Sequence, residues 1–503
     1  MNLLKKYWQE KPLTCIILLA LILRLVAVIF SKGYGMHDDH FLVIEPSQSW
    51  VDGKDYNNWL PWSTPNAQPS GHSFFYVGIH YLIFLFFKVI GFTDAQGKMY
   101  FIRLLHALLS LVTIYASYKI TEKLSNKKTA NQVGLMLAGL WFMPFLSVRN
   151  LVEVVCIPFM MYALWIIVDD QRKNTLVKIF LAGIIIGLGI SIRFQTIIFA
   201  GGIGLALIFL NRWRDFIYYS AGVLISVMLI QGGIDKFMWG RPFAEMQEYI
   251  RYNLANEYSY YVGSWYNYIL LILGILIPPV SFFLFFGFFR TWKKHLIIFL
   301  PVFLFLAFHS YFPNKQERFI LPIVPFIVML GMIGWNEYLE KSFFWKNRTS
   351  LLKSCWIFFI VINFLLLPII TVTYTKKSYV EAMCYLSKYK IKYLIIEDSN
   401  RSSVQMLPYY YAGQWPHYFE FSSESKKKTL KKFIDKFEND SISKQAFIIF
   451  YNEDNLSKRV DSIKTILPNL KRDTVIQPGF IDKVMHWLNP INKNQIIYIY
   501  KSK

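Results

Sequence analysis

The sequence has few acidic residues and few cysteines. Only 32 of its 503 residues are Asp or Glu, against 54 Lys or Arg, so the formal net charge is +22. Of its four cysteines, three lie in apolar segments and Cys384 stands alone outside them, which excludes a disulfide framework and a cysteine-based metal site. The chain also lacks a glycine-rich phosphate loop of the Walker or Rossmann type. These absences leave no recognisable nucleotide site.

Apolar residues, by contrast, are abundant. Hydrophobic residues make up 54% of the chain and aromatic residues 18%, and they form repeated runs of membrane length. The sequence therefore predicts a mainly α-helical, polytopic membrane protein embedded in a lipid bilayer. Lys and Arg are spread through short connectors and the C-terminal region, as topology selection produces, so the basic charge does not predict binding to nucleic acid.

The distribution of Lys and Arg predicts the topology. If every apolar segment crossed the membrane, the basic connectors would lie opposite the basic N-terminus, against the positive-inside rule. One early segment is therefore expected to lie in the interface, and segment 73–92, which carries His80 and Lys88, is the candidate. This leaves about eleven transmembrane helices, a cytoplasmic N-terminus with a retained first helix, and an extracytoplasmic C-terminus. The apolar segments are 13–30, 73–92, 101–120, 132–146, 151–168, 177–192, 194–210, 216–232, 266–289, 295–309, 319–336 and 354–373.

The composition changes at Tyr374, which divides the chain into a membrane domain at 1–373 and a soluble extracytoplasmic domain at 374–503. The second part has a size typical of a domain, and its patterns predict an α/β fold. Strands are expected at 392–396, 446–451 and 495–500, and helices at 379–388 and 426–437.

Charged residues gather on the extracytoplasmic side of this topology. Asp38 and Asp39, flanked by His37 and His40, come directly after the first apolar segment. Carboxylates at a membrane boundary either face water or line a polar cavity, and a cavity would make them functional. Others on this side are Arg149, Glu153, Arg193, Arg241, Arg251, Lys315, Glu317 and Arg318. Singly, many of these would be explained by a solvated loop or by snorkelling to the interface, but together they predict a cavity with acids on one wall and cations on another.

These residue types suit the transfer of a group from an anionic lipid. A carboxylate can accept the proton of an attacking hydroxyl, and Arg or Lys can bind a phosphate and stabilise its charge as it leaves. Because the chain has no nucleotide loop, an activated group on this side would most simply arrive on a lipid phosphate carrier. The residues alone predict a lipid-phosphate-dependent transferase.

The first loop resembles that of glycosyltransferase family 22, the dolichol-phosphate-mannose-dependent mannosyltransferases with the GT-C fold. Residues 37–41, followed by Glu45-Pro46 and Gly53, are similar to the family's Pro-Asp-Glu-His-Phe-Gln, Glu-Pro-Ala-His and Gly. Four further blocks follow in order over roughly residues 10–335. They are Arg149 to Glu153, Ser191 to Arg193, Asp235 to Gly240 with Tyr252-Asn253 and the Tyr261 to Tyr268 run, and Asn314 to Pro322, which is similar to His-Lys-Glu-x-Arg-Phe-x-x-Pro. Asp39, Asn314 and Gln316 depart from the family's Glu, His and Glu, which bears on donor or acceptor identity more than on reaction class.

The resemblance implies an inverting transfer from a polyprenyl-phosphate sugar, with mannose favoured by the family, to a glycan or lipid-linked acceptor. It implies that Asp38 is the base and that Asp39 and Glu45 orient it or the acceptor. Arg193, Lys315 and Arg318 would hold the carrier phosphate. Substrate-binding roles then extend to His37, His40, Arg149, Glu153, Tyr252, Asn253, Trp265, Tyr266 and Glu317, of which the aromatic residues suit a sugar ring and the histidines equally suit a scaffold. Such enzymes need no bound metal or other cofactor.

Other functions remain open at this point. A GT-C enzyme could use an aminosugar or pentose carrier or modify a protein, whereas a flippase would need charges near the bilayer midplane and an internal repeat. A non-catalytic scaffold would not require the ordered motif blocks. The Lys-, Ile- and Asn-rich composition and the additional domain favour a bacterial inner membrane with a periplasm-facing site over an endoplasmic reticulum membrane with a luminal site.

Overall fold

The computed structural model describes residues 2–63, 65–169, 175–438, 445–490 and 495–502. Residues 170–174 of the basic connector between the apolar segments 151–168 and 177–192 therefore lie outside the described residues. The chain forms two compact units. The first consists of Met1–Phe30, Asn58–Ile79 and Phe101–Val372, and the second of Ser31–Asn57, His80–Tyr100 and Thr373–Lys503. The first loop after the N-terminal helices thus belongs to the same unit as the C-terminal residues.

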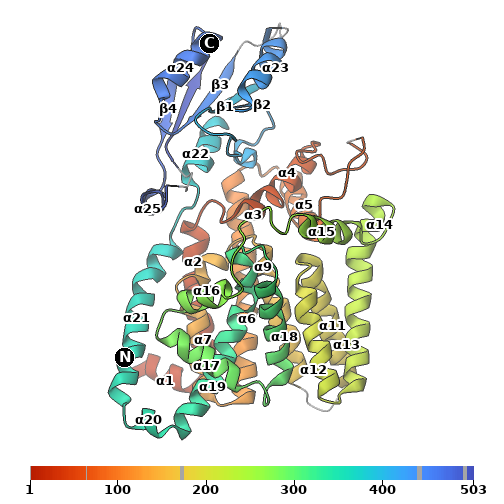
Figure 1. Ribbon diagram of the computed structural model, residues 1–503, viewed down its shortest axis with the longest axis vertical. Helices are drawn as coiled ribbons and strands as arrows, with labels where there is room; N and C mark the ends of the chain where they lie inside the picture. Colours follow the sequence, from red (N-terminus) through yellow and green to blue (C-terminus); the bar gives the residue numbers. More distant parts are fainter. Residues whose placement is uncertain (1, 64, 170–174, 439–444, 491–494, 503) are drawn as a thin grey trace. The chain divides into compact units, whose positions relative to one another are not determined.

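Helices dominate the chain as far as residue 371 (Figure 1). Their bounds are α1 (Asn2–Glu10), α2 (Pro12–Phe30), α3 (His37–Phe41), α4 (Ile44–Val51), α5 (Phe74–Val89), α6 (Ala95–Leu124), α7 (Lys127–Gly139), α8 (Met143–Leu146), α9 (Val152–Val155), α10 (Ile157–Val168), α11 (Thr175–Ile192), α12 (Thr196–Phe209), α13 (Trp213–Val227), the π-helical turn η1 (Met228–Gly232), α14 (Gly233–Trp239), α15 (Ala244–Ala255), α16 (Asn267–Ile275), α17 (Val280–Arg290), α18 (Leu296–Tyr311), the 3-10 helix η2 (Glu317–Ile323), α19 (Val324–Lys341), α20 (Phe343–Lys346) and α21 (Thr349–Thr371).

Six described helices are long and apolar enough to cross a membrane, by length and composition: α2, α6, α11, α13 continued to Trp239, η2 with α19, and α21. Five shorter apolar helices accompany them, among them α5, the helix expected in the interface. The chain is therefore a multi-pass membrane protein. The count of about eleven spanning helices and the interfacial position of α5 stay predictions.

Some of the expected apolar segments are divided, as the run at 132–146 is between α7 and α8. The apolar run at 266–289 forms two helices, because α16 ends at Ile275 and α17 begins at Val280. Pro278 and Pro279 lie between them, and proline has no backbone N–H to continue a helix.

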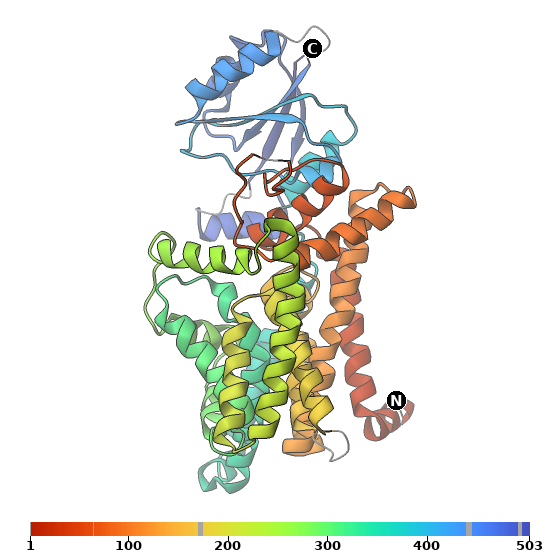
Figure 2. The same ribbon diagram turned by 90° about the vertical axis from the view of Figure 1, so that its right-hand side faces the viewer.

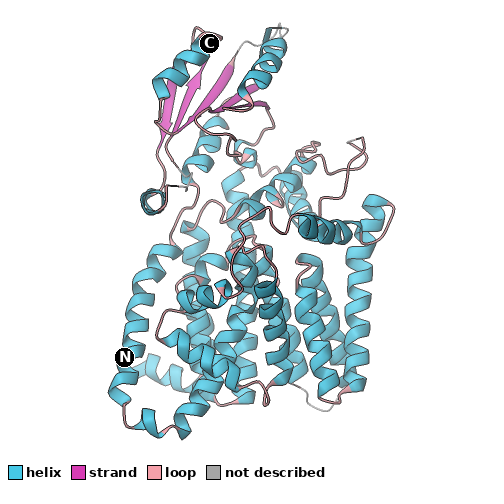
Figure 3. Ribbon diagram, viewed as in Figure 1, coloured by secondary structure: helices cyan, strands magenta, loops and turns pink. Residues whose placement is uncertain are grey.

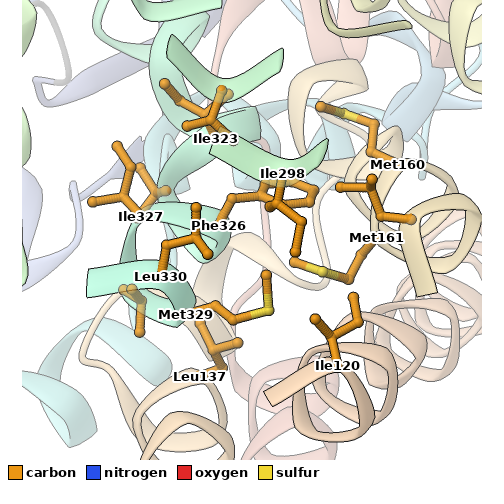
Figure 4. Close-up of a cluster of buried hydrophobic side chains, with 14 of the residues drawn as sticks. Ile120, Leu137, Met160, Met161, Ile298, Ile323, Phe326, Ile327, Met329 and Leu330 are labelled. Carbon is orange, nitrogen blue, oxygen red and sulfur yellow. The ribbon is translucent and has the colours of Figure 1, made fainter. Parts of the chain in front are cut away.

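The core of the first unit is built around α19. Within the most apolar window of η2 with α19, 89% of the residues are buried, whereas the value for α21 is 11%. Helix α19 is therefore central, and α21 presents its side chains outward, as a lipid-facing helix would. Figure 4 shows the packing of this core. Its labelled side chains come from α6, α7, α10, α18, η2 and α19: Ile120, Leu137, Met160, Met161, Ile298, Ile323, Phe326, Ile327, Met329 and Leu330.

Two helix pairs approach so closely that only glycine fits between them. In α17 and α19, a Cβ on Gly287 would collide with the carbonyl oxygen of Gly331, and one on Gly331 with that of Leu284. The pair α11 and α13, which lie side by side in Figures 1 and 2, meets in the same way at Gly183 and Gly222. Small residues at such crossings let membrane helices pack backbone to backbone, which replaces the hydrophobic driving force that a bilayer lacks.

The C-terminal part of the second unit is an α/β sheet structure, as the sequence predicts (Figure 3). Its elements are α22 (Lys377–Leu386), β1 (Tyr393–Asp398), the 3-10 helix η3 (Tyr409–Ala412), β2 (His417–Ser422), α23 (Lys426–Glu438), β3 (Ala446–Tyr451), α24 (Leu456–Lys464), β4 (Lys471–Ile476), α25 (Phe480–Leu488) and β5 (Ile497–Lys501). The strand order is β2-β1-β3-β5-β4. The first three strands are parallel, whereas β5 is antiparallel to both β3 and β4.

The first loop is hydrogen-bonded to the start of this C-terminal part. The backbone N–H of Thr375 donates to the carbonyl of Lys32 over 3.2 Å, and its hydroxyl donates to that of Tyr34 over 2.7 Å. Between them Gly33 has a φ of +77°, and a Cβ there would collide with the carbonyl oxygen of Thr375. The residues after α2 and those after α21 therefore form one junction.

Candidate functional site

The two adjacent acids of the first loop have different surroundings in the second unit. Asp39, the third residue of α3, is buried, and its carboxylate accepts backbone N–H bonds from Gly35 and Met36 at 3.0 and 3.1 Å. It therefore stabilises the start of its own short helix. Asp38 is partly exposed and belongs to the same helical turn. His37 is exposed, with its ring stacked on Phe41 at 4.6 Å.

Glu45 is a buried connector within the second unit. Its side chain has no exposed surface, and Oε1 lies 2.9 Å from Nε2 of His40. The backbone N–H of Tyr410, in η3, donates to both carboxylate oxygens at 3.0 and 3.1 Å. Burial raises the pKa of Glu45, while the bonds from His40 and Tyr410 oppose that shift. The His40 ring stacks on the rings of Tyr34 and Tyr411. Glu45 and His40 are therefore both parts of a packed interior.

The first unit holds a buried cluster of cations around one carboxylate. Glu153 of α9 lies with Oε1 3.1 Å from Nη2 of Arg193 and 3.4 Å from Nε of Arg318. The three residues come from α9, the end of α11 and η2, and Arg193 and Arg318 lie far beyond Glu153 in the sequence. Arg149, just before α9, is also buried and packs over the ring of Phe145 at 4.3 Å.

Neither carboxylate oxygen of Glu153 has a hydrogen bond of good geometry among the described residues, although the ion-pair distances are short. Nε and Nη2 of Arg193 likewise have no hydrogen bond of good geometry among the described residues. Buried polar atoms are nearly always hydrogen-bonded, so such a group indicates a place where water or a ligand completes the bonding. With Arg193 and Arg318 on one acid, the cluster also keeps an excess positive charge, which suits an anionic ligand.

Lys315 has a local role. Its ammonium donates to the backbone carbonyls of His309, at 2.8 Å, and Ser310, at 2.9 Å, and also to that of Phe312. These three bonds use the three donors of the ammonium and cap the C-terminal end of α18. Lys315 could therefore bind a phosphate only in exchange for one of these bonds.

An apolar cavity of about 280 Å³ lies beside the arginine cluster. Phe319 joins the two, because it lines the cavity and its ring lies 5.1 Å from the guanidinium carbon of Arg193 and 5.6 Å from that of Arg318. Asn253, a predicted site residue, is also on the cavity wall. The remaining lining residues come mainly from α12, α15 and α18: Phe194, Gln195, Ile197, Ile198, Met246, Tyr249, Ile250, Leu254, Phe308, His309 and Phe312. Such a lining suits a hydrocarbon chain better than a sugar.

The predicted aromatic site residues are exposed in the first unit, Tyr252 on α15 and Trp265 and Tyr266 just before α16. Tyr252 is 44% exposed, Tyr266 45% and Trp265 66%, so their rings are accessible to a large ligand. The hydroxyl of Tyr252 contacts that of Tyr260. The loop carrying Trp265 is held to the segment before η2, since the N–H of Lys315 donates to the carbonyl of Tyr261 at 2.9 Å. Glu317, at the start of η2, is exposed.

A second buried carboxylate anchors the loop before α5. Glu245 accepts hydrogen bonds from the hydroxyl of Ser70 (3.0 Å), the N–H groups of Gly71 (2.6 Å) and His72 (3.2 Å), and the indole of Trp239 (2.8 Å). Burial raises its pKa to about 7, although these donors favour the charged form. The sequence pattern did not indicate this anchor, because its partners Ser70, Gly71 and His72 are more than 170 residues away.

His309 and Gln195 were not predicted from the sequence, and Tyr268 was quoted in a motif run without an assigned role. His309 and Gln195 line the cavity, and Tyr268 donates to the carbonyl of Gln316 at 3.0 Å and lies beneath Lys315. For His309 and Gln195, a polar side chain inside an apolar segment is the sequence signal. Within the described ranges no group of three His, Cys, Asp or Glu side chains has the arrangement of a metal site.

The chain is similar in sequence to known mannosyltransferases. The chain is 22% identical over 167 residues to alpha-1,2-mannosyltransferase ALG9 of Mus musculus, covering 29% of this chain and 27% of that protein. It is 22% identical over 330 residues to GPI alpha-1,2-mannosyltransferase 3 of Homo sapiens, covering 62% of this chain and 56% of that protein. The chain thus spans between about a quarter and somewhat over half of the length of these curated relatives.

The fold is similar to that of ArnT from Cupriavidus metallidurans, solved in complex with undecaprenyl phosphate. The TM-score is 0.62 at 12% identity, over 97% of both chains, a likeness that establishes the GT-C fold. The model of the Alg9-like mannosyltransferase family, glycosyltransferase family 22, matches residues 15–410, so the resemblance drawn from the sequence motifs is confirmed. More than half of the chain is matched, and the protein belongs to the Alg9-like mannosyltransferase family.

Proposed function

We propose that this protein is an inverting glycosyltransferase that moves mannose from a polyprenyl-phosphate carrier to a hydroxyl of a glycan or lipid-linked acceptor on the extracytoplasmic face. The observation that carries the proposal is the cluster of Arg193 and Arg318 on one carboxylate, next to an apolar cavity. A polyprenyl phosphate has these two features, an anionic head and a hydrocarbon chain. Family membership supplies the reaction class and favours mannose as the sugar.

The first loop supplies the base. Asp39 and Glu45 are buried and committed to backbone N–H groups, whereas Asp38 is partly exposed on the same short helix. Asp38 accepts the proton of the acceptor hydroxyl while the hydroxyl oxygen forms a bond to the anomeric carbon of the sugar. Asp39 and Glu45 hold the helix that carries this base.

The arginine cluster serves the leaving group. The bond between the anomeric carbon and the carrier phosphate breaks, and its electron pair remains on the phosphate oxygen. Arg193 and Arg318 stabilise the charge that develops there, and Glu153 holds the two guanidinium groups in place. The products are the glycosylated acceptor and the free polyprenyl phosphate, and the proton on Asp38 passes to water.

Transfer of radiolabelled mannose from polyprenyl-phosphate mannose tests the proposal. Membranes holding the wild-type protein should label endogenous lipid or glycan acceptors, and membranes with Asp38→Asn should not. Asp55→Asn, a partly exposed acid of the same loop, is the matched control and should retain transfer. Equal labelling with wild type and Asp38→Asn would overturn the role of Asp38.

A second candidate within the fold uses another carrier sugar, since the chain departs from the family pattern at Asp39, Asn314 and Gln316. Polyprenyl-phosphate aminosugar and pentose donors are therefore assayed in parallel. Label that crosses the membrane without forming a new linkage would instead favour a flippase, and it would overturn the transferase proposal for that donor.

A further inference from the structure

The helix α25, between the strands β4 and β5, has its polar and apolar sides reversed for a helix of a water-soluble domain. Its polar residue Asp482 is buried, with a carboxylate oxygen 3.4 Å from the backbone N–H of Lys377. Its large apolar side chains point outward. They are Phe480 (77% exposed), Met485 (47%), Trp487 (80%) and Leu488 (64%).

The other helices around the same sheet have the normal orientation. Helix α22 buries Val380, Met383 and Leu386, and α24 buries Val460 and Ile463. These helices place their apolar sides against the protein, as expected where water is the solvent. The outward apolar side of α25 therefore indicates that this helix faces something other than water.

Contacts within the second unit locate α25 at the membrane boundary. A Cβ on Gly479, the N-cap of α25, would lie 3.2 Å from the carbonyl oxygen of Tyr374. Tyr374 is three residues beyond the end of the spanning helix α21 at Thr371, a distance of at most about 10 Å along an extended chain. The start of α25 is thus tied to the point at which the chain leaves the bilayer.

A second spanning helix ends at the same point. Helix α2 ends at Phe30, and the hydroxyl of the next residue, Ser31, donates to the carbonyl of Thr373 over 3.3 Å. Lys32 then lies 5.9 Å from the ring of Tyr374. The residues that follow the two spanning helices therefore meet at one junction. Lys and Tyr, which are both present there, are residues typical of bilayer interfaces.

We propose that α25 is an interfacial membrane anchor, with Phe480, Met485, Trp487 and Leu488 inserted among the lipids of the outer leaflet. The apolar side of α25 lies at the boundary between lipid headgroups and acyl chains. Helices that lie at this boundary typically carry Trp, Phe and Leu on one side and polar residues on the other. Lys483, exposed on the same helix, can reach the lipid phosphates. The anchor holds the C-terminal sheet, and the first loop hydrogen-bonded to it, at the membrane surface. This inference does not depend on the transfer reaction.

Cysteine accessibility in the full chain tests the anchor. Trp487→Cys is made in a background without the four native cysteines and reconstituted into nanodiscs of phosphatidylethanolamine and phosphatidylglycerol. Lys458→Cys, exposed on α24, is the matched control. A membrane-impermeant maleimide should modify position 487 about tenfold more slowly than position 458, since burial of one large apolar side chain shifts an equilibrium by at least that factor. Equal rates would overturn the proposal.

A nitroxide at the same positions distinguishes lipid from protein as the cover. In lipid, the label at 487 collides often with oxygen and rarely with a water-soluble nickel complex, and the label at 458 shows the reverse. Protection of position 487 from both reagents would mean that a protein covers α25, which would also overturn the proposal. Leu488→Cys repeats the measurement if Trp487→Cys does not fold.

Discussion

Replacing Glu45 should release the first loop from the C-terminal part of the second unit. In Glu45→Ala the backbone N–H of Tyr410 and Nε2 of His40 lose their partner in a site without solvent access. Each buried group left unpaired costs about 1–3 kcal/mol, so we expect a loss of about 4 kcal/mol in local stability. Glu45→Gln keeps one oxygen as an acceptor for Tyr410, and its loss should be only about 1 kcal/mol.

Hydrogen exchange of the reconstituted protein measures this difference. At about 1.4 kcal/mol for each factor of ten, Glu45→Ala should speed exchange in η3 and α3 by roughly a thousandfold, up to the limit set by global unfolding. Glu45→Gln should speed it by less than about tenfold. Strand β3 is the internal reference, because its residues are buried and belong to the core of the sheet.

The reasoning would be refuted if exchange in η3 were the same in Glu45→Ala and wild type. Activity separates positioning from direct catalysis. If Glu45 acts by holding Asp38, transfer should fall in parallel with local stability, and Glu45→Gln should restore most of it. If Glu45 were itself the base, Glu45→Gln would be as inactive as Glu45→Ala while η3 stayed protected.

Three further predictions follow from the first unit. Arg193→Gln or Arg318→Gln should raise KM for the polyprenyl-phosphate donor by roughly 10–100-fold, because a charge-assisted hydrogen bond contributes about 1.5–3 kcal/mol; an unchanged KM in initial-rate assays would contradict the phosphate site. The pKa of Glu245 is raised to about 7 from 4.5, so the folded state binds the proton more tightly and the stability of the α14–α15 region, measured by hydrogen exchange, should fall by up to about 3 kcal/mol between pH 4.5 and 7. Glu245→Gln should remove that pH dependence, and its persistence would exclude Glu245 as the cause. Gly331→Ala should lower thermal stability by several degrees, because its Cβ meets the carbonyl of Leu284, whereas Gly201→Ala, with open space around it, should not; equal melting temperatures would contradict the close packing.

Much of the C-terminal sheet could be predicted from the sequence, and the part that could not has a physical reason. Runs within the predicted strands became β1, β3 and β5, which are the inner strands and are largely buried. The missed strands β2 and β4 are the two edges of the sheet. Edge strands carry charged and exposed residues, as Lys471–Ile476 does, so their apolar signal is weak. Helix α25 was not predicted from the sequence either.

The site shows the same division between local and distant information. The motif blocks predicted the residues of the arginine cluster, but not that Glu153 joins Arg193 to Arg318, since this pairing depends on three separate helices. The partner of Glu45, Tyr410, is 365 residues away and carries no motif. The capping of α18 by Lys315 is different, because its acceptors lie three to six residues earlier and a Lys near a helix end is a known C-terminal signal.

The burial of the first-loop acids bears directly on the choice of base. A general base must reach the acceptor hydroxyl and must be able to take up its proton. Asp39 accepts two backbone N–H bonds that favour its charged form, and Glu45 accepts the N–H of Tyr410 in a site with no exposed surface. Asp39 would have to break its helical turn, and Glu45 its bond to Tyr410, before either carboxylate could contact a substrate. Asp38 is partly exposed on the same helix, so it can contact an acceptor while its two neighbours keep that helix in place.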